Sequence, residues 1–177
     1  MIGETINAPY AEKFTVSNVF SSDMVVQRGE HIRVWGFADA SENGHKVSGE
    51  FMGMFAEALI ENGAWTLTFG ARLNACAEQG NSMRIYTDRT AFVFENVLVG
   101  DVFMVIGQSN VAYSMAAHRA AVPEAERGGV GYDVPSTPIR LHYNSLMQET
   151  GVTRGTEEVC AELRNRETWK RADAAAV

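Results

Sequence analysis

The part of this sequence best suited to chemistry is a short turn made of Gly107, Gln108, Ser109 and Asn110. It follows directly on the apolar run 102–106 and precedes a segment rich in alanine and methionine. A serine at a strand-to-helix turn projects from the carboxyl end of a sheet, where ligand crevices form in open α/β folds. Its amide then lies in the first helical turn, where free N–H groups and the helix dipole stabilise an oxyanion. The pattern therefore indicates a nucleophile at Ser109, or alternatively a plain helix cap made by Ser109 or Asn110.

The elements around this turn predict the start of an α/β unit. The apolar run 102–106 does not alternate with polar residues, which is typical of a strand covered on both faces. Asn110 can cap a helix over 111–121, and Pro123 with its acidic neighbours predicts a further helical turn. A second strand is expected at 139–143, whereas 144–168 is polar and irregular, and no closing element is expected after Trp169.

The first half of the chain predicts a different architecture. Short apolar runs separated by turn residues are typical of an antiparallel β-sandwich. Trp65, Leu67 and Phe69 alternate, which places them on one face of a strand, and Asn62-Gly63 favours a tight hairpin. Strands are expected at 14–20, 24–27, 31–37, 46–51, 54–60, 64–69, 82–87 and 91–97.

These patterns divide the chain into an N-terminal extension (1–13), a jelly-roll or immunoglobulin-like β-sandwich (14–98) and a partial α/β domain (99–177). With 46% hydrophobic and 21% charged residues, the composition is that of a globular protein with its own core. The formal charge of −7, without any Lys/Arg-rich run, makes nucleic acid an unexpected partner. Neither a signal peptide nor a membrane-spanning stretch is expected.

Other residues with chemical potential have simpler interpretations. Cys76 and Cys160 lack metal-ligand spacing, which leaves one disulfide or two buried thiols. Asp101 is expected to cap or to form an ion pair just before the apolar run. Trp35 and Trp65 are expected in the core rather than in a sugar-stacking platform. His118 and His142 are expected to be packed or solvent-facing rather than to act as a base.

Three longer stretches add a family resemblance. They are VFSSDMVVQRGEHIRVWGFAD (19–39), NGAWTLTF (62–69) and NVLVGDVFMVIGQSN (96–110), with fainter similarity at IRLH (139–142) and WKRADAAAV (169–177). In this order they resemble the amino-terminal part of the sialate O-acetylesterase family, a branch of the SGNH hydrolases related to carbohydrate acetyl esterases. The resemblance covers residues 14–115.

The resemblance implies a β-sandwich followed by an SGNH-type α/β domain and a serine that attacks acetyl esters of sugars. It makes Ser109 the nucleophile and its amide an oxyanion donor, whereas Gly107, Gln108 and Asn110 shape the turn. It implies an acetylated sugar as substrate, sialic acid above all, no metal or organic cofactor, and an extracytoplasmic location. The chain departs from the family at Phe103, where relatives commonly have tryptophan, and at Val111, where they have methionine.

One part of the family's machinery has no counterpart in this sequence. In SGNH enzymes the base is a histidine in a late Asp-x-x-His motif, and further oxyanion donors come from later loops. None of the four histidines here has an aspartate three residues before it. The chain is therefore expected to be one part of a carbohydrate O-acetyl esterase, catalytically incomplete by itself, with a second polypeptide supplying the histidine. Partner binding or self-association is expected to cover the sheet edges and the apolar face of the incomplete α/β domain. The alternative is a non-catalytic, truncated sugar-binding or assembly module.

Overall fold

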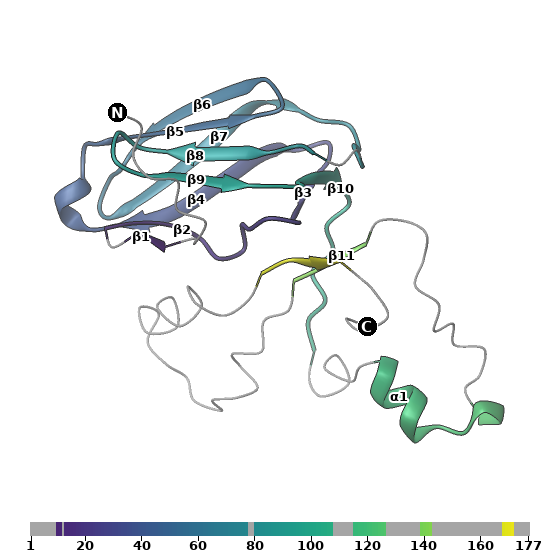
Figure 1. Cartoon of the computed structure of the whole chain (residues 1–177). Coiled ribbons are helices and arrows are strands. Elements are labelled where there is room, and N and C mark those ends of the chain that lie inside the picture. The colour runs from purple at the N-terminus through teal and green to yellow at the C-terminus, as the bar shows by residue number, and fades with distance from the viewer. Residues whose placement is uncertain are drawn as a thin grey trace.

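The computed structural model of the chain describes residues 10–11, 13–77, 80–107, 115–126, 139–142 and 168–171. Its main body is a β-sandwich of two antiparallel four-stranded sheets (Figure 1). The first sheet has the order β1 (Tyr10–Ala11), β2 (Phe14–Val16), β4 (His31–Ala38) and β7 (Ala64–Arg72). The second has the order β6 (Met54–Leu59), β5 (Lys46–Phe51), β8 (Met83–Tyr86) and β9 (Ala91–Phe94). A short 3-10 helix, η1 (Ala40–Glu42), connects β4 to β5.

The core forms between the two sheets because apolar residues alternate along their strands. On β7, Trp65, Leu67 and Phe69 are buried, whereas the residues between them face solvent. Val34 on β4 and Ile85 on β8 are also fully buried, so both sheets contribute to one cluster. Burial of each such side chain stabilises the fold by roughly 1.5–3 kcal/mol. The predicted β-sandwich is thereby confirmed.

One strand pair differs from a purely antiparallel sandwich. β3 (Val25–Gln27) and β10 (Leu98–Gly100) run parallel, with Leu98 opposite Val25 and Gly100 opposite Gln27. Between these two strands the chain forms β4 to β9, and β10 then runs in the same direction as β3. The chain after β10 therefore begins next to the loop between β3 and β4.

The C-terminal half contains short elements. α1 (Met115–Ala121) lies within the predicted helix, and η2 (Glu124–Glu126) is the helical turn expected after Pro123. β11 (Arg140–Leu141) falls in the strand predicted at 139–143, and it pairs antiparallel with β12 (Lys170–Arg171), where no element was expected. The SGNH-type α/β domain therefore stays a prediction.

Two further sequence expectations concern the cysteines and the membrane. Cys76 is a free thiol whose Sγ accepts a hydrogen bond from Asn81 Nδ2 at 3.6 Å, and Cys160 lies outside the described residues. Within the described ranges, no helix has the length and apolar character needed to cross a membrane.

Candidate functional site

The predicted catalytic turn lies at the border of the described structure. Gly107 is described and exposed, whereas Gln108, Ser109 and Asn110 lie outside the described residues. The nucleophilic geometry of Ser109 therefore stays a prediction. The structure describes the segment that leads to it, residues 101–107.

The start of this segment is held by the loop after β3. Arg28 Nε donates to Asp101 Oδ1 at 2.7 Å, and the Arg28 amide donates to Gly100 O at 2.9 Å. The Val102 amide donates to Gln27 Oε1 at 2.8 Å. Together these contacts orient the chain as it leaves the sandwich.

The expected ion pair of Asp101 is thus confirmed. The hydrogen bond from Arg28 lowers the pKa of the Asp101 carboxyl, and the same bond raises the pKa of the Arg28 guanidinium. Both side chains are about half exposed, so solvent screens the pair and it contributes little to stability. Its main effect is on the direction of the chain.

The apolar run that follows differs from the prediction. Residues 102–106 form no strand, and Phe103 and Met104 have 82% and 85% of their surface exposed. A strand covered on both faces needs ladder partners and packed layers above and below it. No described strand pairs with 102–106, so the prediction of a buried strand is wrong for these residues in this structure.

The antiparallel strand pair β11–β12 docks on the same end of the sandwich. Trp169 Nε1 donates to Val19 O at 2.6 Å, and the Trp169 amide donates to Ser21 Oγ at 3.0 Å. Arg140, which is buried, places Nη1 at 3.4 Å from Asp23 Oδ1. Figure 1 shows the β11–β12 strand pair below the sandwich, beside the chain that leaves β10. The two sequence stretches with faint family resemblance thus meet at this junction.

Replacement of Trp169 by alanine is expected to lower the free energy of unfolding by about 2 kcal/mol, because packing is lost and Val19 O loses its donor. Chemical denaturation followed by far-UV circular dichroism measures the change. Ile139→Ala is the matched control, since Ile139 directly precedes β11 but is 42% exposed. Equal unfolding midpoints for Trp169→Ala and the wild type would show that the β11–β12 strand pair does not dock on the sandwich.

The structure describes both histidines that were weighed as a base, His118 and His142. His142 packs its ring against Trp169, with centroids 5.5 Å apart, which agrees with a packed histidine. His118 lies on α1 and is half-buried.

The two tryptophans of the sandwich differ in environment. Trp65 is buried in the core as expected, but Trp35 is 41% exposed and makes a T-shaped contact with Phe20, at a centroid distance of 4.7 Å. The expectation of a core position for Trp35 is wrong, because Ile32 and Val34 occupy the inward positions of β4 and direct Trp35 outward.

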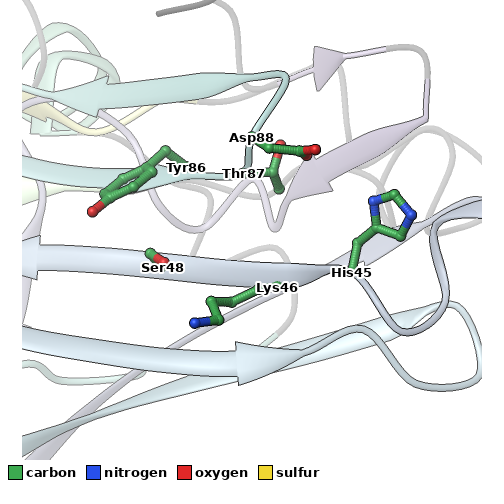
Figure 2. Close-up of a pocket in the computed structure, with 6 residues that line it drawn as sticks. All are labelled: His45, Lys46, Ser48, Tyr86, Thr87 and Asp88. Atoms are coloured by element: carbon green, nitrogen blue, oxygen red, sulfur yellow. The ribbon is translucent and has the colours of Figure 1, made fainter.

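A separate pocket of about 300 Å³ lies on the outer face of the second sheet. Figure 2 shows the polar residues that line it, which come from two segments: His45, Lys46 and Ser48, and Tyr86, Thr87 and Asp88. Sequence reasoning missed this site, since neither segment forms a recognisable motif and only strand pairing brings them together. In the described part of the chain, no group of three His, Cys, Asp or Glu residues is arranged to hold a metal ion.

Comparisons with known proteins bear on the fold. No protein-family model and no curated protein matches this chain. Among solved structures, the chain is similar to a carbohydrate acetylesterase from Xanthomonas citri, with a TM-score of 0.50 and 23% sequence identity. The similarity covers 60% of this chain and 24% of that protein, so it concerns a limited part of the longer protein. The chain therefore shares a β-rich fold with a part of a carbohydrate acetylesterase.

Proposed function

We propose that this chain is part of a serine-dependent carbohydrate O-acetyl esterase related to the sialate O-acetylesterases. The observation that carries the proposal is that a sequence resemblance and a fold similarity point to the same class of enzyme. The sequence around Gly107 to Asn110 resembles that esterase family, and the fold is similar to that of a part of a carbohydrate acetylesterase.

The proposed reaction is acyl transfer through Ser109. Its hydroxyl loses a proton to a base and attacks the ester carbonyl, while the Ser109 amide and further donors hold the oxyanion. Collapse of the tetrahedral intermediate expels the sugar hydroxyl, and water then releases acetate from the acyl-enzyme. Gly107, Gln108 and Asn110 shape the turn that presents the hydroxyl. The reaction as proposed uses neither a metal nor an organic cofactor.

We further infer that residues 99–177 contribute the first part of an SGNH-type α/β domain, and that a second polypeptide supplies the rest with its Asp-x-x-His motif. The exposure of Phe103 and Met104 supports this inference, because five consecutive apolar residues in contact with water favour association. Residues 103–106 have no ladder partner among the described strands, so their backbone offers an edge to a neighbouring strand. Self-association of this chain is the other way to cover it.

A second candidate function is a non-catalytic sugar-binding or assembly module. The observation in its favour is that none of the four histidines belongs to an Asp-x-x-His motif. A serine without a base is a weak nucleophile, so the sandwich alone would bind rather than hydrolyse.

Activity assays on the chain alone, and on the chain expressed with a neighbouring gene product that contains an Asp-x-x-His segment, distinguish these functions. The substrates are 4-nitrophenyl acetate and an acetylated sialic acid. Hydrolysis only in the presence of the second polypeptide supports the split esterase. Turnover no higher than that of the Ser109→Ala variant, with and without the second polypeptide, would favour the non-catalytic module.

A further inference from the structure

The pocket on the second sheet exists because two strand pairings have different lengths. β5 pairs with β6 from Lys46 to Phe51, but with β8 only from Ser48 to Phe51. The chain turns away after Tyr86, so no strand lies beside Lys46 on the β8 side. The space left there is the pocket, open to solvent on the outer face of the sheet.

Hydrogen bonds and an ion pair next to the pocket hold the turn after β8 and the segment before β5 in place. Thr87 Oγ1 accepts from the amides of Arg89 and Thr90 at 3.2 and 3.1 Å, which holds the turn after β8. Arg89 Nη1 lies 2.9 and 3.2 Å from the two carboxylate oxygens of Glu42, which is buried. A site whose walls are held in place loses little freedom when a ligand binds.

The charged side chains around the pocket do not favour an anion. Lys46 Nζ lies 3.0 Å from Glu57 Oε1, and the Asp88 carboxylate is part of the lining. An anionic ligand would have to compete with Glu57 for Lys46 and would lie near Asp88. These contacts therefore favour a neutral ligand over a phosphate or a carboxylate.

The remaining groups match a ligand that donates hydrogen bonds and has an apolar face. Asp88 can accept, and the Tyr86 ring supplies an apolar surface with a polar tip. The Ser48 hydroxyl donates to Glu57 Oε1 at 3.5 Å and can still accept from a ligand. The Tyr86 hydroxyl donates to Glu50 Oε1 at 2.9 Å, and this bond raises the pKa of Tyr86, so that the phenol stays neutral.

We propose that this pocket binds one unit of a neutral sugar chain, with Asp88 and Ser48 hydrogen-bonded to its hydroxyl groups and Tyr86 against its ring. Sugar rings combine alternating hydroxyl groups with apolar C–H faces, which is the combination the pocket offers. The site is built from β5, the end of β8 and the adjoining turns, and the proposal does not depend on esterase activity.

Affinity electrophoresis of the full chain in native gels tests the proposal. The chain carries a formal charge of −7 and migrates toward the anode, so binding to an uncharged polysaccharide in the gel slows it. The probes are galactomannan, mixed-linkage β-glucan and arabinoxylan, with polygalacturonate as the anionic comparison. We expect retardation by at least one neutral polymer, and retention of that binding in high salt.

The variants Asp88→Asn and Ser48→Ala are each expected to weaken this binding by about tenfold, the loss typical of one hydrogen bond to a charged or buried group. Asp88 is exposed, so its variant should fold normally. Glu30→Gln is the matched control, since it removes an exposed carboxylate far along the sequence from the pocket. Ser109→Ala is expected to bind as the wild type does, which separates this proposal from the esterase proposal.

The proposal would be overturned if no neutral polymer retards the chain. It would equally be overturned if Asp88→Asn and Ser48→Ala bind as tightly as the Glu30→Gln control. Retardation by polygalacturonate alone, lost in high salt, would indicate ion exchange on the protein surface rather than a sugar site.

Discussion

Replacement of Ser109 by alanine is expected to lower the acetylesterase turnover of the assembled enzyme by about a thousandfold or more. Alanine removes the oxygen that forms the acyl-enzyme in the proposed reaction and leaves the backbone amide in place. Because the hydroxyl acts only when a base is present, the loss is expected in the complex with the second polypeptide. Measurement of kcat and KM with 4-nitrophenyl acetate and with an acetylated sialic acid quantifies it.

Ser41→Ala is the control for this experiment, because Ser41 is an exposed serine in η1 and far along the sequence from the turn. It should leave kcat and KM unchanged. A purely structural role of Ser109 as a helix cap predicts a different outcome. Loss of a cap costs about 1 kcal/mol of stability, so a Ser109→Ala enzyme with nearly normal kcat and a lowered unfolding midpoint would contradict the nucleophile and support the cap.

Replacement of Gly36 by alanine is expected to lower the free energy of unfolding by about 3 kcal/mol. A Cβ at this position would lie 1.9 Å from Thr15 O and 2.5 Å from Trp65 Cζ2. Neither neighbour can move freely, since Trp65 Nε1 donates to Thr15 O at 3.2 Å and the Trp65 ring stacks on Phe14 at 5.1 Å. The strands must therefore separate, or this part of the core must repack.

Gly70→Ala is the matched control for Gly36→Ala. Gly70 lies on β7, the strand that pairs with β4, but a Cβ there meets no atom within 4 Å. Alanine at this site is expected to be neutral or to stabilise the strand by about 0.5 kcal/mol, because glycine loses more conformational freedom on folding. Urea denaturation of both variants measures the difference. Similar unfolding midpoints would show that β2 and β4 are not packed as described.

The strands of the sandwich could be predicted from the sequence because their side chains alternate. The 46–51 strand coincides with β5, and the pattern of Trp65, Leu67 and Phe69 identified both the strand and its inward face. Alternation is a local property, since each residue points to the side opposite its neighbours wherever the strand lies. The ion pair of Asp101 was one of the two roles expected for it, because an acidic residue that precedes an apolar run can pair with a cation of an adjoining loop.

Features that depend on contacts between distant segments could not be predicted. The parallel pairing of β3 with β10 and the docking of Trp169 on Val19 join parts of the chain that share no local pattern. Trp35 was misplaced because a tryptophan by itself suggests the core, whereas its position on β4 depends on which neighbours face inward. The apolar run 102–106 has the composition of a buried strand, but burial also requires partners that a run of residues does not specify.

The sequence by itself predicted most strands of the sandwich and the inward residues of β7, and it indicated Ser109 as the candidate nucleophile. Side-chain periodicity and a short chemical motif are local, so they can be read along the chain. Only the tertiary structure decided that β8 ends before β5 does, which opens the polar pocket beside Lys46 and Asp88. It also decided that the β11–β12 strand pair is held against the sandwich by Trp169 and Arg140. Both features arise from the pairing of segments far apart in sequence, which is set by the packing of the whole core rather than by any one stretch of residues.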